Sequence, residues 1–404
     1  MRKFQATPAV VAKLGAAAGF AIALTACGGG GGEAAINNAP PPSPPPPAVQ
    51  SGVFKDSNVT GLDFVSGQES GTTGSDGRYT CETGNSVTFS VGAVELGSAD
   101  CATLAAPPSL VASGLFDDPE VVNMARFLLM LDGDEDPTNG ISISDDLRTM
   151  ADSWPQVDFS AADLAAELTV PISDIMSVEQ RMAGPPDSAT ALAHLDDTLA
   201  CAYSGAFTGT LSGSNTGAVA MIFARNLRGR SQDEFSWQAF DPNESFILST
   251  SGPYQLAARP SLDSRPFDQT VLIDAVFDTP DSLSGNWDYP PEARSGAFSA
   301  NRIGGDTAEF RMTGGFSTAE GSGVLVLDIE GTSVTGEAFE VFEGGSFDIT
   351  GNLVGTNLDI QAVGAGETID ATGVVTLDAD GTPVRVSGNL QGGGSFTAVG
   401  CRLN

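Results

Sequence analysis

Gly205-Ala206-Phe207-Thr208 recurs further along the chain as Gly314-Gly315-Phe316-Ser317. Four more segments are repeated in the same order, at offsets between 98 and 109 residues: Gly217–Met221 with Gly323–Leu327, Ser245–Leu248 with Ser346–Ile349, Ser284–Asn286 with Ser387–Asn389, and Gly296–Ser299 with Gly394–Thr397. Self-similarity at a regular spacing is the sequence signature of a repeated structural unit. Residues 200–404 therefore consist of two related halves of about a hundred residues each.

Both halves contain short, strand-like apolar segments separated by glycine, which predicts antiparallel strands joined by tight turns. Such a sheet must protect its edge strands, and a closed barrel does so completely. We therefore expect the two repeats to build one antiparallel β-barrel-like domain over residues 200–404. A two-sheet sandwich is the alternative. A membrane-spanning barrel is disfavoured because the strands are short and aromatic girdles are missing.

The segment before the repeats, residues 114–199, has the periodicity of helices. Asp118 and Pro119 are a good N-cap and a good first helical residue. An apolar stripe follows them, formed by Val121, Val122, Ala125, Leu128, Leu129 and Leu131. A second helix is expected to begin near Ser144, and shorter helices are expected over residues 160–168, 173–182 and 188–199.

An acidic loop separates the first two predicted helices, and its candidate ligands are Asp132, Asp134, Asp136, Asn139 and Asp145. Carboxylates at alternate positions suit a hard cation, and their order resembles the EF-hand calcium loop. The resemblance is incomplete, because Pro137 replaces the family's glycine and Asp145 replaces its bidentate glutamate. It implies a Ca²⁺ site that joins two helices and has no catalytic role. The alternative is a solvated acidic loop that caps these helices.

Residues 51–113 alternate between apolar and polar side chains as strands do, and Asp76-Gly77 is a strong tight-turn signal. The stretch Thr73–Tyr79 and its flanking strands resemble the prealbumin-like modules of carboxypeptidase regulatory-like domains. The resemblance implies a small β-sandwich and no particular activity.

The start of the chain has the order of a secretory signal, with basic residues followed by an apolar run and small residues. Leu24-Thr25-Ala26-Cys27 resembles the lipobox of bacterial lipoproteins, which implies that residues 1–26 are removed and that Cys27 is acylated, for example with palmitate. A transmembrane helix is the alternative, but residues 14–26 are too few to span a bilayer. Gly28 resembles the pattern that sorts lipoproteins to the outer membrane.

Residues 27–50 follow as a tether that cannot bury a core, because they consist largely of glycine and proline. The run Pro40–Pro47 predicts extended polyproline II, a semi-rigid spacer. A ligand for a proline-binding domain is the alternative.

The lipobox and the recurrent Gly-x-Phe strands, such as Gly205-Ala206-Phe207, together resemble the transferrin-binding surface lipoproteins. That resemblance implies a C-terminal barrel that captures a metal complex or a host protein.

The charge balance limits the partners that the chain can bind. Removal of residues 1–26, which carry three basic residues and no acidic one, changes the formal net charge from −33 to −36. A surface of this kind repels nucleic-acid phosphates and anionic lipid headgroups. Cations, basic partners or a salty environment are more compatible with it.

Cysteine usage points to an oxidising compartment. With Cys27 assigned to the lipid, Cys81, Cys101, Cys201 and Cys401 allow three pairings. Neighbourhood in the sequence favours Cys81–Cys101 within one module. It also favours Cys201–Cys401, where the first and last strands of a barrel would be antiparallel neighbours at its seam. No Cys-x-x-Cys is present, which disfavours zinc.

No catalytic motif stands out. The only histidine, His194, is expected on the exposed side of its helix, and no Gly-x-Ser-x-Gly elbow is present. Arg225, Arg228 and Arg230 form a basic cluster that could hold an anion. Pairing with the nearby Asp233 and Glu234 is the preferred interpretation.

These observations predict a mainly β protein with a small N-terminal sandwich, a helical segment and a repeat-built β-domain. The predicted function is binding or a structural role without enzymatic activity, by a monomer anchored to the outer membrane on its periplasmic face or at the cell surface. The protein or glycan partner is not identified by the sequence. Alternatives are the capture of a metal complex or host protein and, third, an envelope hydrolase.

Overall fold

The computed structural model describes residues 47–225, 233–254, 261–264, 271–305, 308–379 and 381–403. The predicted signal peptide, Cys27, most of the tether, Arg228 and Arg230 lie outside the described residues. Within the described ranges, none of the helices combines the length and the apolar character that a membrane crossing requires.

The N-terminal part contains two small sheets, the first mixed and the second antiparallel. The first has the order β5-β1-β8 and the second has the order β4-β3-β6-β7. Their strands are β1 (Val49–Phe54), β3 (Asp63–Ser66), β4 (Glu69–Thr72), β5 (Arg78–Glu82), β6 (Ser86–Val91), β7 (Val94–Asp100) and β8 (Leu104–Ala105). Within the first sheet, β8 lies parallel to β1.

The helical segment follows, with α1 (Pro107–Leu110), α2 (Pro119–Met130), α3 (Asp145–Ala151), α4 (Leu164–Glu167), α5 (Thr169–Val178) and α6 (Ser188–Tyr203). The predicted starts at Pro119, near Ser144 and at Ser188 are present, whereas α4 begins at Leu164 instead of residue 160 and α5 at Thr169 instead of residue 173. The Asp118 side chain accepts a hydrogen bond from the Glu120 amide, and Ser144 accepts one from the Leu147 amide. Each cap satisfies an amide that has no partner inside the helix.

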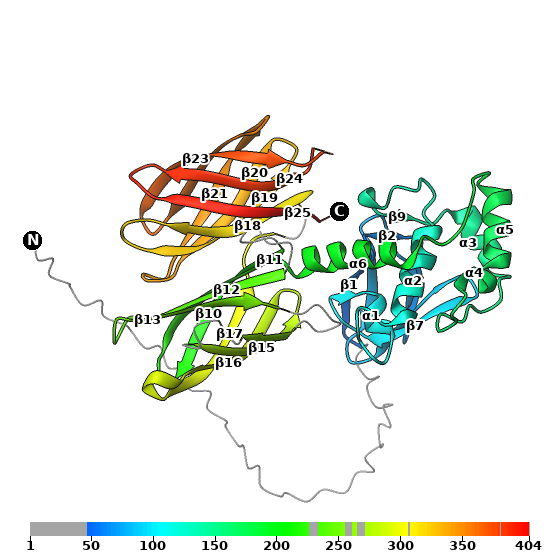
Figure 1. Ribbon diagram of the computed structural model, residues 1–404, viewed down its shortest axis with the longest axis horizontal. Helices are drawn as coiled ribbons and strands as arrows, with labels where there is room; N and C mark the ends of the chain where they lie inside the picture. Colours follow the sequence, from blue (N-terminus) through cyan, green and yellow to red (C-terminus); the bar gives the residue numbers. More distant parts are fainter. Residues whose placement is uncertain are drawn as a thin grey trace, which may run out of the picture. The chain divides into compact units, whose positions relative to one another are not determined.

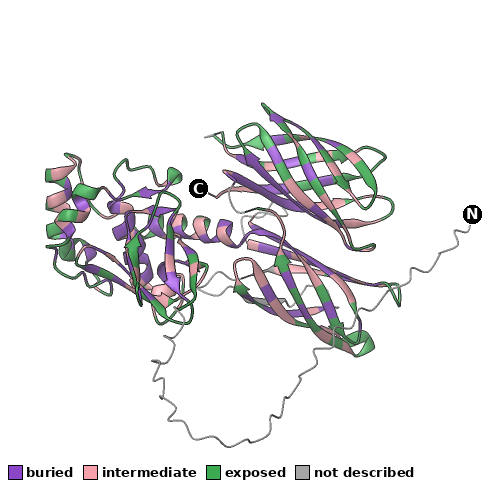
Figure 2. Ribbon diagram, turned by 180° about the vertical axis from the view of Figure 1, so that it is seen from behind, coloured by how far each residue is buried: buried purple, intermediate pink, exposed green. Residues whose placement is uncertain are grey.

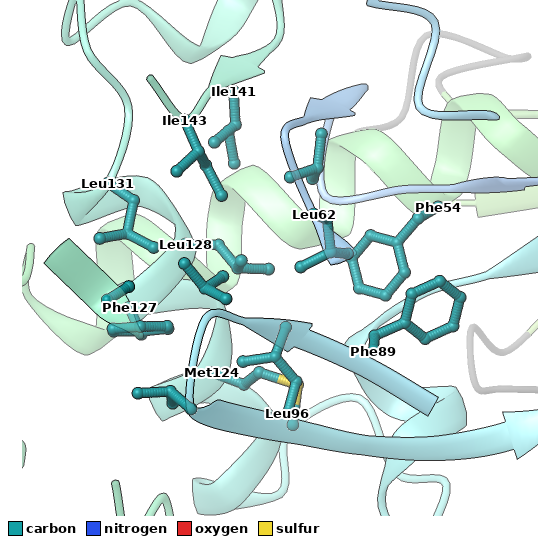
Figure 3. Close-up of a cluster of buried hydrophobic side chains, with 14 of the residues drawn as sticks. Phe54, Leu62, Phe89, Leu96, Met124, Phe127, Leu128, Leu131, Ile141 and Ile143 are labelled. Carbon is teal, nitrogen blue, oxygen red and sulfur yellow. The ribbon is translucent and has the colours of Figure 1, made fainter. Parts of the chain in front are cut away.

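The N-terminal sheets and the helices share one hydrophobic core. Phe54 and Phe89 from the sheets belong to the same buried cluster as Met124, Phe127 and Leu128 of α2 (Figure 3). Burial of each large side chain contributes about 1.5–3 kcal/mol. Sheets this small could not bury enough surface alone, so α2 completes their core.

The first repeat forms an eight-stranded antiparallel sheet, called here the first repeat sheet. Its strands are β10 (Gly205–Gly213), β11 (Gly217–Arg225), β12 (Asp233–Asp241), β13 (Phe246–Pro253), β14 (Ser261–Ser264), β15 (Leu272–Thr279), β16 (Ser282–Tyr289) and β17 (Arg294–Arg302). They lie in the order β13-β12-β11-β10-β17-β16-β15-β14, so β13 and β14 are its two ends.

The second repeat forms a closed eight-stranded barrel (Figure 1). Its strands are β18 (Phe310–Ser317), β19 (Ser322–Glu330), β20 (Ser333–Glu340), β21 (Gly345–Val354), β22 (Asn357–Gly364), β23 (Glu367–Leu377), β24 (Pro383–Leu390) and β25 (Ser395–Arg402). Closure comes from the pairing of β18 with β25, in which Phe310 lies opposite Arg402.

The prediction of a mainly β fold with a closed antiparallel barrel is confirmed. The two repeats do not share that barrel, however, and each builds its own eight-stranded sheet. The repeated segments lie on the first, second, fourth, seventh and eighth strands of each sheet. Eight strands already enclose an interior that side chains can fill, so one repeat is enough for one barrel.

The repeated glycines have a packing role across neighbouring strands. Gly285 lies opposite Phe298 in the first repeat, and Gly388 lies opposite Phe396 in the second. A Cβ added at Gly388 would lie 2.2 Å from the Phe396 ring, so only glycine leaves room for that ring. In the first repeat, a Cβ added at Gly285 would instead meet the Asp274 carbonyl at 2.4 Å and the Ala275 side chain at 2.5 Å, so the neighbouring strand β15 sets the limit there.

Both expected disulfides are present, with Cα–Cα distances of 5.6 Å for Cys81–Cys101 and for Cys201–Cys401. The seam that the sequence suggested for the second pair is wrong. Cys201 lies near the end of α6, and β25 pairs with β18 and β24 instead of with a strand that begins at Cys201.

Candidate functional site

The turn at Lys55–Asn58, called here the 55–58 turn, joins β1 to β2 (Val59–Thr60) and contacts distant parts of the chain. Lys55 and Asn58 pair as an isolated antiparallel bridge, and Ser57 has a φ of 58°. A side chain in this left-handed region is strained, and such strain persists only where surrounding contacts hold it. One contact is the bond from the Ser57 amide to Thr198 Oγ1 of α6, at 3.2 Å.

Asp56 is the buried acid of this turn. Its exposed fraction is 0%, and neither carboxyl oxygen has a hydrogen-bond partner among the residues that the structure describes. His194 Nε2 lies 3.5 Å from Asp56 Oδ1. Burial raises the pKa of Asp56 to about 8. The carboxyl group is therefore largely neutral at pH 7.

His194 lies on the side of α6 that meets this turn, so the prediction of an exposed histidine is wrong. Its side chain is 17% exposed. Burial lowers its pKa, and Asp56 and Asp197 oppose that change. The sequence pattern marked only the apolar stripe of the helix. It did not reveal that a polar turn covers another face.

Ser57, His194 and Asp56 lie together but do not form a catalytic relay. Ser57 Oγ donates a hydrogen bond to the Pro137 carbonyl at 2.7 Å and lies 3.2 Å from His194 Nε2. Asp56 approaches the same nitrogen. A Ser-His-Asp triad needs the acid on one ring nitrogen and the serine on the other. The observed arrangement suits a structural contact.

Lys55 connects the turn to the C-terminal end of the chain. Its ammonium group donates hydrogen bonds to the Leu403 carbonyl, at 2.8 Å, and to Asn58 Oδ1. Burial lowers the pKa of Lys55 to about 8, against the attraction of Asp76. This residue is the only lysine after residue 26, which was the one sequence signal that could have singled it out.

A cavity of about 500 Å³ lies beside these groups, and its lining includes Lys55, Ser57, His194, Arg225, Arg402 and both cysteines of the Cys201–Cys401 disulfide. Its cations already have partners. Arg225 forms ion pairs with Asp196, Asp197 and Asp233, the last at 3.1 Å, which agrees with the predicted pairing to Asp233. Arg402 donates to the Thr138 carbonyl. Carboxylates therefore compensate the charge of Arg225, whereas Lys55 and Arg402 donate to neutral oxygens.

In the acidic loop, Asp132 and Asp134 have structural partners. Asp132 is fully buried, and its Oδ1 accepts a hydrogen bond from the Ser142 amide at 3.0 Å. Burial raises the pKa of Asp132 to about 6. Asp134 accepts a hydrogen bond from Asn139 at 3.0 Å. These bonds position β9 (Ile141–Ser142), which lies parallel to β2.

The other two carboxylates of the predicted site, Asp136 and Asp145, also have partners within the protein. Asp136 accepts hydrogen bonds from the amide and hydroxyl of Thr138, and Asp145 forms an ion pair with Arg148. Across the described residues, no group of three or more His, Cys, Asp or Glu side chains has a metal-binding arrangement. The loop would have to exchange these bonds to surround Ca²⁺, so calcium binding stays a prediction.

Comparison with known proteins adds no family. No protein-family model and no curated protein matches the chain. Among solved structures, HpuA from Kingella denitrificans in complex with human haemoglobin is 13% identical, covers 49% of this chain and 87% of its own, and has a TM-score of 0.17. Kievitone hydratase from Nectria haematococca is 9% identical, covers 50% and 90%, and has a TM-score of 0.20. Neither likeness assigns a function at such scores.

Asp56→Asn is expected to remove a pH dependence of stability. The folded state keeps the Asp56 proton between pH 3.8 and about 8, where the unfolded chain loses it. The free energy of unfolding therefore falls as the pH rises through this window, by ~1.4 kcal/mol per unit. Urea unfolding of both proteins between pH 5 and 8 measures the difference, which should increasingly favour the variant. Parallel curves would show that Asp56 titrates normally.

Millimolar calcium is predicted to raise the melting temperature through Asp132, Asp134 and Asp136. A cation would remove the repulsion among these carboxylates, and binding at a hundredfold excess over Kd stabilises by ~2.7 kcal/mol. Magnesium and sodium at matched ionic strength control for general screening. A calcium-specific shift that Asp134→Asn leaves intact would rule out this loop as the site.

Proposed function

We propose that this protein is a non-enzymatic lipoprotein of the bacterial outer membrane, anchored through Cys27, which binds a protein partner on the outside of its closed barrel. The observation that carries the proposal is the filled interior of that barrel. Its inward side chains form a continuous apolar cluster that includes Met312, Leu327, Ile349, Val375 and Phe396. A packed interior of this kind leaves the outer surface for recognition.

One part of that outer surface is already covered. Val324 and Val341 at the barrel surface pack with Ala206, Ala220 and Ile222 of the first repeat sheet in a shared apolar cluster. Strands β21–β24 do not contribute to this cluster. They are therefore the part of the barrel that we assign to the partner.

Strands β21–β23 expose apolar side chains at matched positions. Val354 on β21 lies opposite Asn357 on β22, which lies opposite Val374 on β23. Val354 is 67% exposed and Val374 is 59% exposed. The alternation of buried and exposed residues along the barrel strands is visible in Figure 2. Exposed apolar groups bordered by polar residues are a feature of protein-binding surfaces.

The predicted net charge of −36 for residues 27–404 favours a basic partner, because long-range attraction accelerates such encounters. Capture of a metal complex inside the barrel is the less favoured alternative, since the described interior is occupied by side chains. A transferrin-like host protein bound on the outside remains compatible with the proposal.

The anchor and the binding face are tested with two sets of variants. Cys27→Ser is expected to move the protein from the membrane fraction to the soluble fraction, because the acyl chains supply the attachment. Retention of this variant without detergent would contradict the anchor.

The soluble Cys27→Ser protein is then tested for binding to peptidoglycan, lipopolysaccharide and transferrin, by biolayer interferometry. We expect saturable binding to transferrin, which is the protein among these three probes. The Val354→Asp, Val374→Asp double variant should weaken this binding at least tenfold. The matched control is Val170→Asp with Met176→Asp on α5, where both residues are 43% exposed. Equal losses in both pairs would contradict the assigned face. Ester or glycoside hydrolysis that Ser57→Ala or His194→Ala abolishes would overturn the non-enzymatic proposal.

A further inference from the structure

Within the described part of the chain, three buried polar atoms in or next to the first repeat sheet have no hydrogen-bond partner: Trp237 Nε1, Thr250 Oγ1 and Tyr254 Oη. Trp237 is 0% exposed and Tyr254 is 6% exposed. More than about 90% of buried polar groups in proteins have a partner, and leaving one unpaired costs ~1–3 kcal/mol. Gathered at one end of a sheet, these three atoms mark a place where a ligand can supply the missing partners, whereas the barrel has the single hydroxyl of Thr313 among its described buried hydroxyls without a partner.

The three side chains belong to one end of the first repeat sheet. Trp237 on β12 lies directly opposite Thr250 on β13, so both face the same side. That side is the interior, because Trp237 and Leu248 belong to its apolar cluster. Tyr254 follows β13 and packs its ring 5.4 Å from Phe223, another interior residue.

This end of the first repeat sheet is also where the two repeats differ. In the closed barrel, β21 and β22 pair along their length, with Val354 opposite Asn357. The corresponding strands of the first repeat, β13 and β14, are the two ends of the strand order as far as the structure describes them. Among the described strands, β13 is therefore the end of the strand order that lies next to Trp237 and Thr250.

The interior of the first repeat sheet is aromatic, whereas that of the barrel is mostly aliphatic. The buried aromatic residues of the first are Tyr203, Phe207, Phe223, Phe235, Trp237, Tyr254, Phe277, Trp287 and Phe298. In the barrel only Phe310 and Phe396 are buried aromatic members of the core. Aromatic rings favour stacked and edge-to-face contacts with another ring.

A second tryptophan of the same interior provides a contrast. Trp287 Nε1 donates a hydrogen bond to the Ser212 carbonyl at 3.1 Å. The indole group of Trp237 has the same requirement, and it is directed into the same interior without an acceptor. The missing group is therefore an acceptor, since an indole N–H can only donate.

We propose that the first repeat sheet binds a small, uncharged aromatic molecule at its β13 edge. The ligand carries an oxygen that accepts a hydrogen bond from Trp237, with the Thr250 and Tyr254 hydroxyl groups beside it. An anion is disfavoured because moving a charge into this apolar interior without an ion partner is costly. An aliphatic ligand would leave the aromatic contacts unused.

The probes are coumarin, an uncharged bicyclic lactone, and naphthalene, which has a similar size and no oxygen. Isothermal titration of the soluble Cys27→Ser protein is expected to show at least fivefold tighter binding of coumarin. In proton–nitrogen NMR spectra, coumarin should shift the Trp237 indole signal, assigned with Trp237→Phe, and leave the Trp287 signal in place.

Thr250→Val and Tyr254→Phe remove one hydroxyl each with little change in volume. They should weaken coumarin binding about three- to tenfold and leave naphthalene binding unchanged, as expected for the loss of one hydrogen bond. Thr313→Val is the matched control, because Thr313 Oγ1 is another buried hydroxyl without a partner and lies on β18. Folding of these variants is checked by thermal melting.

Three results would overturn the proposal. They are equal affinities for coumarin and naphthalene, an unshifted Trp237 signal at saturation, or no binding of either probe. The last result would mean that buried water alone satisfies these atoms.

Discussion

The arrangement of this protein depends on a covalent contact between the end of α6 and the last strand of the barrel. The Cys201–Cys401 disulfide joins residues 200 positions apart. On the loop-entropy estimate, closing so long a loop stabilises the fold by about 5 kcal/mol. The hydrogen bond from Lys55 to the Leu403 carbonyl acts at the same place, and a bond from a charged group contributes only ~1.5–3 kcal/mol. The disulfide therefore contributes more than the polar contacts to holding the end of α6 next to the last barrel strand.

The 55–58 turn contacts the two segments that the Cys201–Cys401 disulfide joins. It contacts α6 through Thr198 and His194, the acidic loop through Pro137, and the chain end through Leu403. A fully ionised Asp56 in this position would be a buried charge, which is expensive unless paired. Burial raises the pKa of Asp56 and so favours its neutral form, with His194 Nε2 3.5 Å from its Oδ1. The same arrangement explains why a serine, a histidine and an aspartate meet without forming a triad.

The sequence predicted those features that depend on neighbouring residues. The caps at Asp118 and Ser144 follow from local chemistry, and the repeats follow from direct comparison of segments. Both disulfide pairings were also predicted, although the reason offered for Cys201–Cys401 was wrong because Cys201 lies in a helix. Local patterns could not reveal whether the repeats share one barrel, since closure depends on which strands pair at its ends. The contact between Ser57 and His194 joins residues 137 positions apart, and nothing in the pattern of α6 indicates it. The orphaned indole of Trp237 is likewise a property of packing alone.

The central claim is that the disulfide holds α6, the 55–58 turn and the chain end together, while the barrel closes independently. Hydrogen–deuterium exchange of the Cys201→Ser, Cys401→Ser double variant tests it most directly, with Cys81→Ser, Cys101→Ser as the control. We predict faster amide exchange at residues 55–58, at the end of α6 and at residues 398–403 together, with β21–β23 as protected as in the wild type. Unchanged exchange at the 55–58 turn, or loss of protection throughout the barrel, would contradict the claim.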